Sequence, residues 1–326
     1  MRIKMDKHKK PEKNLFREFN RAFEEFTKPL IKEYIGEVKE ARALSYTIKS
    51  GRNRFRSGLP SLLLNDYSRG ALVGAISEIS WSAILILDDI GDKTRIRRGK
   101  KAVWLKFGLL EAVHAAALGF IISEELAVKN FSEHKEIKLT LHKAIKMTLK
   151  AQIEQNNFSF DKASTHSLLN NYLRKTALGR WPLEATTIID DSLSEKEKRE
   201  IVGFIKIMGI VGQIKNDLDD FGIYYDDNDY EPKMKDLEGE TISYPIAVFF
   251  NDASEKDKKE FVDNYWGKAI GKRRAEKVMH VLNRYKVITK CEKKIKDEIS
   301  KARFLIGESP TRYKSLLTEW VKSYVS

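Results

Sequence analysis

Apolar residues recur along this chain three or four positions apart, and no stretch alternates apolar and polar residues as a β-strand would. Residues 13–48 show this helical spacing, and residues 67–90 form a longer, almost wholly apolar segment. We expect further helices at about 102–128, 136–157 and 168–190, with Pro182 kinking or breaking the last of them. The pattern predicts an all-α protein whose most apolar helices are buried on every side.

Composition agrees with this prediction. Only 7 of the 326 residues are proline and 18 are glycine, so few residues interrupt helices. We find no internal repeat, linker or shift in composition, and we therefore expect a single all-α domain over residues 1–326, with residues 1–12 as a basic N-terminal tail. Cys291 is the one cysteine, so no internal disulfide forms, which is typical of a reducing cytosol.

No segment is typical of a secretory signal or a membrane span. The basic N-terminus has no apolar run behind it, and acidic residues interrupt the two most apolar windows, 70–87 and 107–122. We therefore expect a cytoplasmic protein. Its net charge of +13 is compatible with nucleic acid, anionic lipid or small polyanions, but no nucleic-acid-binding motif accompanies the charge, and we expect no nucleic-acid partner.

An acidic cluster stands where the longest apolar segment ends. Asp88 and Asp92 are four residues apart, which on a helix brings both carboxylates to one face, about 6 Å apart at their β-carbons. Two like charges at this distance repel unless a cation lies between them, and paired carboxylates suit Mg²⁺. Surface helices carry such patterns by chance, so this motif alone is weak evidence.

A second acidic cluster strengthens the interpretation. Asn216, Asp217 and Asp220 end another apolar helical segment, 128 residues after the first cluster. Two such helices facing each other across a cavity could hold several Mg²⁺ ions, a diphosphate at the mouth and a hydrocarbon chain below. Arg97, Arg98 and Lys175 would add positive charge.

These motifs, in this order, resemble those of the trans-prenyl diphosphate synthases. That family carries DDxxD followed by RRG, a Glu ten residues before the first Asp, a mid-chain KT pair, a QI pair before the second acidic motif, and SxP or TxP in the next loop. The matching positions here are Asp88-Asp89-Ile90-Gly91-Asp92, Arg97-Arg98-Gly99, Glu78, Lys175-Thr176, Gln213-Ile214 and Ser243-Tyr244-Pro245. The resemblance implies the class I isoprenoid synthase fold, a single large helical bundle with a central cavity.

The resemblance also implies an activity. Three Mg²⁺ ions hold an allylic diphosphate, the diphosphate leaves, and isopentenyl diphosphate attacks the resulting cation to give a product five carbons longer. Asp88, Asp92 and Asn216 would be metal ligands, with Asp89, Asp217 and Asp220 as supporting acids of the metal site. The catalytic group would be Arg97 and Lys175 on the allylic diphosphate, with Thr176 and Gln213 facing the cation. Arg54, Arg56 and Arg98 would bind isopentenyl diphosphate. Lys235 would supply a positive charge for substrate binding from the polar loop 225–238.

The chain departs from the family at four positions. Asn53 replaces a Lys that binds isopentenyl diphosphate, Trp81 replaces a His or Gln of the same sub-site, Asn216 replaces the first Asp of the second motif, and Thr241 replaces a loop Lys. Trp81 either packs in the core or partly fills the isopentenyl diphosphate sub-site. Two alternatives therefore stay open: a terpene synthase that ionises a prenyl diphosphate without isopentenyl diphosphate, and a non-catalytic subunit of a heteromeric synthase.

Three weaker expectations concern product and partners. In the family, the residues four and five positions before the first Asp form the floor of the cavity, and the small Ala83 there favours a product of C20 or longer. The segment GLLEAVHAAALG, 108–119, resembles the helix of the family's homodimer interface. The basic C-terminal helices either are a solvated face or contact an anionic membrane, where a long prenyl product would have to go.

Overall fold

The computed structural model describes residues 11–35, 41–51, 54–155, 157–160, 164–222, 234–307 and 309–322. The internal contacts of the chain divide into two compact units. Unit 1 comprises residues 1–146, 178–205 and 303–326, and unit 2 comprises residues 147–177 and 206–302. The single domain over residues 1–326 stays a prediction.

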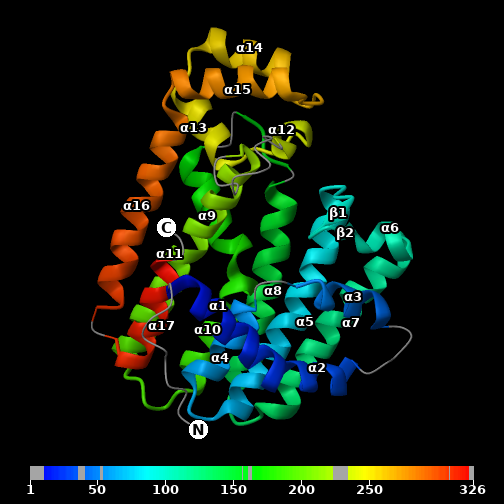
Figure 1. The fold of residues 1–326 in the computed structure, drawn as a ribbon, viewed down its shortest axis with the longest axis vertical. Coiled ribbons are helices and arrows are strands. Elements are labelled where there is room, and N and C mark those ends of the chain that lie inside the picture. The colour runs from blue at the N-terminus through cyan, green and yellow to red at the C-terminus, as the bar shows by residue number, and fades with distance from the viewer. Residues whose placement is uncertain are drawn as a thin grey trace. The chain divides into compact units, whose positions relative to one another are not determined.

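The described residues of unit 1 are helical apart from one short hairpin and the connecting loops (Figure 1). Its elements are α1 (Pro11–Ala22), a π-helical segment (Phe23–Thr27), α2 (Lys28–Ile35), α3 (Arg42–Lys49), α4 (Phe55–Leu63), α5 (Tyr67–Gly91), α6 (Val103–Phe107), α7 (Leu109–Asn130), α10 (Ala177–Ile189), α17 (Thr311–Lys322) and the unit's shares of α8 (Lys135–Gln155), α11 (Glu195–Asp220) and α16 (Val287–Leu305).

The centre of unit 1 is α5, which packs along α4 and α7. Small residues allow these close approaches: a β-carbon on Gly74 would lie 2.2 Å from the carbonyl oxygen of Ser57 on α4, and one on Gly119 of α7 would lie 3.0 Å from the β-carbon of Ala83. By length and hydropathy α5 could span a membrane, but 83% of its apolar window is buried within the structure, which is typical of a core helix. Asp66 caps its N-terminus by accepting hydrogen bonds from the N–H groups of Ser68 and Arg69.

A short antiparallel hairpin follows α5, in a segment for which the sequence pattern predicted no strand. Strand β1 (Ile96–Arg97) pairs with β2 (Lys100–Lys101), and the turn residues Arg98 and Gly99 both have positive φ, 54° and 76°. Strands of two residues are too short to show an alternating pattern, so periodicity cannot reveal them. The hairpin reverses the chain directly after the first acidic cluster.

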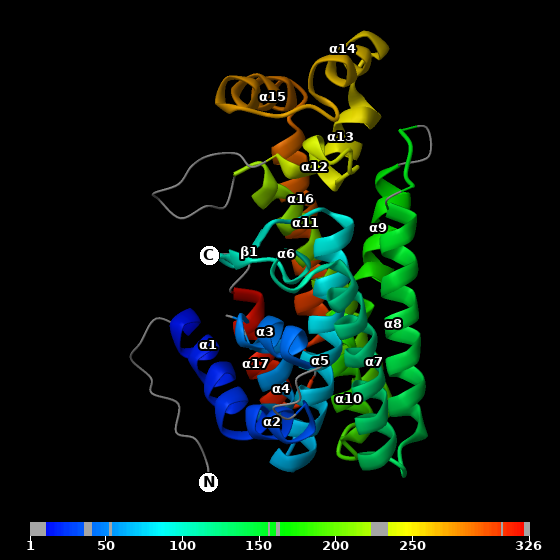
Figure 2. The same ribbon diagram turned by 90° about the vertical axis from the view of Figure 1, so that its right-hand side faces the viewer.

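Unit 2 consists of α9 (Thr165–Lys175), α12 (Lys235–Glu238), α13 (Tyr244–Asp252), α14 (Glu255–Tyr265), α15 (Lys272–Arg284) and its shares of α8, α11 and α16. Figure 2 shows α14 and α15 side by side. Unit 2 contains an aromatic cluster. The ring centroids of Phe249 and Phe261 are 4.7 Å apart, and those of Phe160 and Phe250 are 4.0 Å apart.

The predicted interruption of helix 168–190 is present but at another residue. The helix is interrupted at Thr176, between α9 and α10, whereas Pro182 lies inside α10. The Thr176 hydroxyl donates to the carbonyl oxygen of Tyr172 at 2.8 Å, a local bond that competes with helix continuation. The all-helical class is otherwise as predicted.

Candidate active site

The first acidic cluster lies at the C-terminal end of α5 in unit 1. Asp92 is the residue after the last helical one, and its N–H still bonds to the carbonyl oxygen of Asp88 at 2.9 Å, so the two acids keep helical spacing. Asp88 is partly exposed and Asp92 is exposed, whereas Asp89 is 3% exposed. The two acids predicted as metal ligands are thus accessible, and the middle acid is buried.

The hairpin returns Arg97 to this cluster. Its Nε donates to a carboxylate oxygen of Asp89 at 2.6 Å, and its Nη2 lies 3.3 Å from a carboxylate oxygen of Asp88 and closer still to Asp89. The order DDxxD–RRG therefore has a local structural cause, because β1 and the turn at Arg98 bring the first arginine back to the acids.

Asp89 and Arg97 shift each other's pKa. Burial raises the pKa of Asp89, and the hydrogen bond and charge of Arg97 oppose that rise. Burial alone would lower the pKa of Arg97, but Asp89, Asp88 and Asp92 together raise it. Without a guanidinium beside it the buried Asp89 carboxyl would be harder to ionise. Arg97 therefore occupies the position of a counter-cation among the acids.

The second acidic cluster, in unit 2, has a different environment. Asp217 is 4% exposed, and its carboxylate accepts hydrogen bonds from the Tyr172 hydroxyl, from the Tyr244 N–H at 2.9 Å and from the Gln213 side-chain amide at 3.0 Å. Burial raises its pKa to about 6, although the three hydrogen bonds oppose the shift. Asn216 is exposed beside it.

Three motifs that are distant in sequence meet at this carboxylate. Tyr172 lies three residues before Lys175 on α9, Gln213 and Asp217 lie one turn apart on α11, and Tyr244 starts α13 inside the Ser243-Tyr244-Pro245 motif. Burial and the charge of Asp217 raise the pKa of Tyr172 well above its ordinary value, so its hydroxyl stays a donor. Sequence reasoning missed Tyr172, and its only signal is a tyrosine one turn before the KT pair.

The Asp220 carboxylate is also hydrogen-bonded within the protein. Its carboxylate accepts from the N–H groups of Lys235 and Asp236 at 2.9 and 3.0 Å, and its carbonyl oxygen accepts from the N–H of Met234 at 2.7 Å. It therefore binds the N-terminus of α12, where a negative charge is favoured. Residues 225–233 of the predicted loop lie outside the described residues.

The KT pair is held by its own neighbours in unit 2. The Lys175 Nζ donates to the Gln155 side-chain oxygen at 2.8 Å, and the positive charge of Lys175 helps to lower the pKa of Asp217. The Thr176 hydroxyl uses its one proton on Tyr172, which leaves the lone pairs of the hydroxyl oxygen as its outward polar group.

Two of the three arginines predicted to serve isopentenyl diphosphate, Arg54 and Arg56, have different surroundings. Arg54 is buried in an ion pair with Glu78, donates to the carbonyl oxygen of Ile48 at 2.7 Å and lies 4.0 Å from the ring centroid of Phe23. Arg56 is only partly buried and stacks on the ring of Trp81. Asn53 lies outside the described residues.

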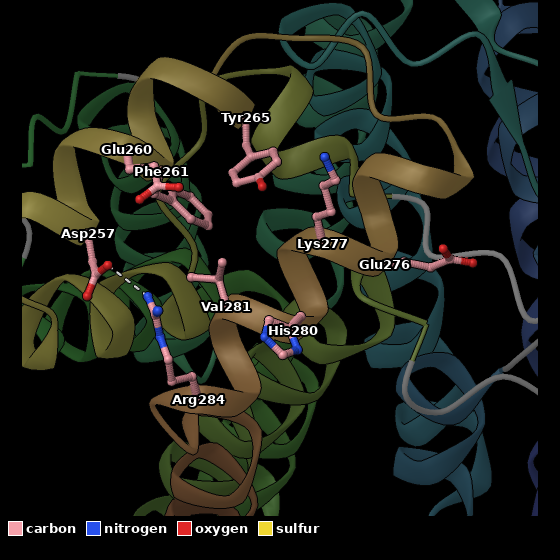
Figure 3. A pocket seen from close by; sticks show the side chains of 9 residues that line it. All are labelled: Asp257, Glu260, Phe261, Tyr265, Glu276, Lys277, His280, Val281 and Arg284. Carbon is pink, nitrogen blue, oxygen red and sulfur yellow. Dashed lines mark hydrogen bonds and ion pairs between the residues drawn. The ribbon is translucent and has the colours of Figure 1, made fainter.

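A hollow that contains none of these motifs lies between α14 and α15 (Figure 3). It measures about 470 Å³, is lined among others by Phe261, Tyr265 and His280, and has Arg284 donating to Asp257 at 2.8 Å on its side. None of the residues predicted from the sequence lines it. Across the described part of the chain, no three His, Cys, Asp or Glu side chains are gathered closely enough to hold a metal ion.

The donor chemistry nevertheless fits Mg²⁺ at the end of α5. Asp88 and Asp92 offer two accessible carboxylates one helical turn apart, the hard oxygen ligands that Mg²⁺ prefers. Asp89 and Asp217 have their oxygens engaged by protein donors. The predicted metal set thus contains accessible members and internally bonded members.

Comparison with known proteins agrees with the motifs. A family model described as polyprenyl synthetase matches residues 40–283. A geranylgeranyl pyrophosphate synthase, janG of Penicillium janthinellum, is 24% identical over 246 residues, which cover 70% of this chain and 63% of that protein. The match thus spans less than two thirds of the length of this curated relative.

Solved structures share the fold. A geranylgeranyl pyrophosphate synthetase from Pyrococcus horikoshii is 24% identical, with a TM-score of 0.83 over 95% of this chain and 98% of that one. A decaprenyl diphosphate synthase from Rhodobacter capsulatus is 18% identical, with a TM-score of 0.86 over 97% and 98%. A polyprenyl synthase from Caulobacter crescentus, solved with calcium and isoprenyl diphosphate, is 16% identical, with a TM-score of 0.83 over 99% of both chains.

At these identities the solved structures establish the all-α fold, which confirms the predicted fold class. The family model covers most of the chain, including both acidic clusters, the KT pair and the SxP motif. This chain therefore belongs to the polyprenyl synthetase family.

Proposed function

We propose that this protein is a Mg²⁺-dependent prenyltransferase that condenses an allylic prenyl diphosphate with isopentenyl diphosphate. The observation that carries the proposal is the end of α5, where Asp88 and Asp92 are accessible, one turn apart, and balanced by Arg97, which the hairpin returns to them. A diphosphate needs such a combination, because its charge is neutralised by metal ions on acids and by a guanidinium. Family membership supports the assignment.

The roles of the side chains follow from their chemistry. Bound Mg²⁺ on Asp88, Asp92 and Asn216, three ions in the complete site, would neutralise charge on the departing diphosphate. Arg97 and Lys175 would bind the same group. The Thr176 hydroxyl oxygen and the Gln213 carbonyl oxygen would face the allylic cation. The Thr176 hydroxyl donates to Tyr172 and the Gln213 side-chain amide nitrogen donates to Asp217, so the oxygen of each side chain is the electron-rich group left over. Arg56 and Arg98 would bind isopentenyl diphosphate.

We propose a product of C20 or longer. The names of relatives, a geranylgeranyl and a decaprenyl diphosphate synthase, support this length. Ala83 is a weaker argument than the sequence implied, because its β-carbon faces Gly119 of α7 and its small size already serves helix packing.

We also propose a homodimer formed through α7. Exposed apolar side chains follow one another along this helix at intervals of three, eight and seven residues: Leu110, Val113, Ile121 and Val128, exposed by 69%, 41%, 54% and 48%. A continuous apolar stripe on a surface helix is typical of an interface. Ile121→Lys should yield monomers by light scattering, whereas Phe304→Lys, at a side chain exposed by 85% on α16, should leave the dimer intact.

A cytoplasmic location and a peripheral membrane contact for product release complete the proposal. The helix α15 supports the contact, because five of its thirteen residues are arginine or lysine: Lys272, Arg273, Arg274, Lys277 and Arg284. Sedimentation with anionic vesicles, compared with neutral ones, tests this contact.

The activity is tested by incubating the purified protein with Mg²⁺ and geranyl, farnesyl or geranylgeranyl diphosphate, with and without isopentenyl diphosphate. Longer prenyl diphosphates that form only when isopentenyl diphosphate is present are the expected result. Terpene hydrocarbons or alcohols formed without it would make the protein a terpene synthase, and no turnover until a second protein is added would make it a subunit of a heteromeric synthase.

A further inference from the structure

Two arginines of one segment face different surroundings in unit 1. Arg54 is 7% exposed and is held by Glu78, the carbonyl oxygen of Ile48 and the ring of Phe23. Arg56, at the start of α4, is partly exposed, and its guanidinium carbon lies 4.0 Å from the ring centroid of Trp81 on α5. Arg54 is thus part of the core, and Arg56 is the arginine of this pair that reaches the surface of the unit.

Room for the stack comes from a glycine on a third helix. A β-carbon on Gly179 of α10 would lie 3.1 Å from Nε of Arg56 and 3.2 Å from Cζ3 of Trp81. Both distances are tighter than ordinary van der Waals contact, so any larger residue would press on both partners at once. The arrangement therefore depends on α4, α5 and α10 together.

The position of the stack on α5 relates it to the acids. Trp81 lies seven residues before Asp88, and seven residues are close to two full turns, so the two side chains share one face of the helix about 10 Å apart along its axis. Both are only partly buried, in a helix whose other faces are largely in the core. The stacked guanidinium therefore lies on the same side of α5 as Asp88.

Stacking suits a guanidinium that has to bind phosphate. The ring covers the flat face of Arg56, whereas the N–H groups that bind phosphate oxygens point outward in the guanidinium plane. A stacked side chain also has fewer rotamers to lose when a ligand binds. The stack with Arg56 offers Trp81 a third role beside the two alternatives that the sequence left open.

We propose that Trp81 is a positioning residue that holds Arg56 for the diphosphate of the non-allylic substrate, and that Gly179 is the residue that admits this stack. The inference rests on the proposed function for the identity of the ligand. It assigns Trp81 an effect on isopentenyl diphosphate through Arg56, and no direct contact with a phosphate.

The test is calorimetric titration of the full-length protein with isopentenyl diphosphate in the absence of an allylic substrate, so that no turnover occurs. Trp81→Leu removes the aromatic face and should raise the Kd about tenfold, and Trp81→Phe, which keeps a weaker one, about threefold. Gly179→Ala should raise the Kd as well. Its matched control is Gly203→Ala, where a new β-carbon meets the Leu305 side chain at 3.1 Å, away from the stack.

A double-mutant cycle separates positioning from general damage. If Trp81 acts through Arg56, the effect of Trp81→Leu should disappear in an Arg56→Gln background. The Michaelis constant for the allylic substrate should stay within twofold in Trp81→Phe. An unchanged Kd in Trp81→Leu, or additive effects of the two substitutions, would overturn the inference and leave the proposed function standing. Wild-type protein that binds no isopentenyl diphosphate would overturn both.

Discussion

The two acidic clusters have nearly the same sequence pattern, but their carboxylates differ in exposure and in hydrogen bonding. At the end of α5, Asp88 and Asp92 are accessible and Asp89 is buried against Arg97. At the end of α11, the carboxylates of Asp217 and Asp220 accept hydrogen bonds from protein donors, and Asn216 is the exposed member. One acidic motif thus has two accessible carboxylates, whereas the carboxylates of the other are hydrogen-bonded within the protein.

The difference has a structural origin. The chain after α5 turns back within a few residues and brings one cation, Arg97, to the acids. Around Asp217, by contrast, the N-terminus of α13 and the end of α9 come close enough to donate directly. A carboxylate becomes a ligand or an anchor according to the donors that tertiary packing places beside it.

The largest expected effect is on Asp88. Asp88→Asn should lower turnover about 10³-fold or more, because it removes a charged ligand from the metal site, while the unfolding temperature stays nearly unchanged. Steady-state assays and thermal melts measure the two quantities. Turnover within tenfold of wild type would contradict the assignment of Asp88 as a metal ligand.

Asp217 should affect stability most. Asp217→Leu leaves the Tyr172 hydroxyl buried without its acceptor and leaves the Tyr244 N–H with the Tyr172 oxygen alone, at 3.0 Å, so we expect a loss of about 3 kcal/mol in the free energy of unfolding. Urea denaturation measures it. Tyr172→Phe removes one donor and should cost about 1 kcal/mol. A stable Asp217→Leu protein without activity would instead indicate a direct catalytic role.

Added Mg²⁺ distinguishes the clusters without an activity assay. Mg²⁺ should raise the unfolding temperature of the wild type in the presence of diphosphate, because a ligand that binds only the folded state stabilises it. Asp88→Asn should abolish this rise, and Tyr172→Phe should retain it from a lower starting temperature. Equal loss of the rise in both variants would mean that the clusters do not differ in this way.

The smallest expected effect is at Asp220. Asp220→Asn keeps an acceptor for the N–H groups of Lys235 and Asp236 but loses the charge at the start of α12, so we expect a loss of about 0.5 kcal/mol. Asp219→Asn, one residue earlier, is the control for a general change of charge. A much larger loss of turnover than of stability would indicate that Asp220 binds metal.

The helices were predictable because apolar residues at helical spacing mark the buried face of each helix. The long apolar α5 and α7 and the acids at the ends of α5 and α11 were readable for this reason. The hairpin at Ile96–Lys101 was not, because its strands are two residues long, and neither was the break at Thr176, which a side-chain hydrogen bond marks instead of a proline.

The sequence by itself determined that the chain is helical, where its two acidic clusters lie and which family it resembles, because periodicity and motif spacing are local properties. Only the tertiary structure decided which of these charged groups are engaged internally. Asp217 receives its donors from residues 45 and 27 positions away, and Arg54 finds Glu78 24 positions away while Arg56 meets Trp81. Such partners are chosen by the packing of separate helices, which no local pattern encodes.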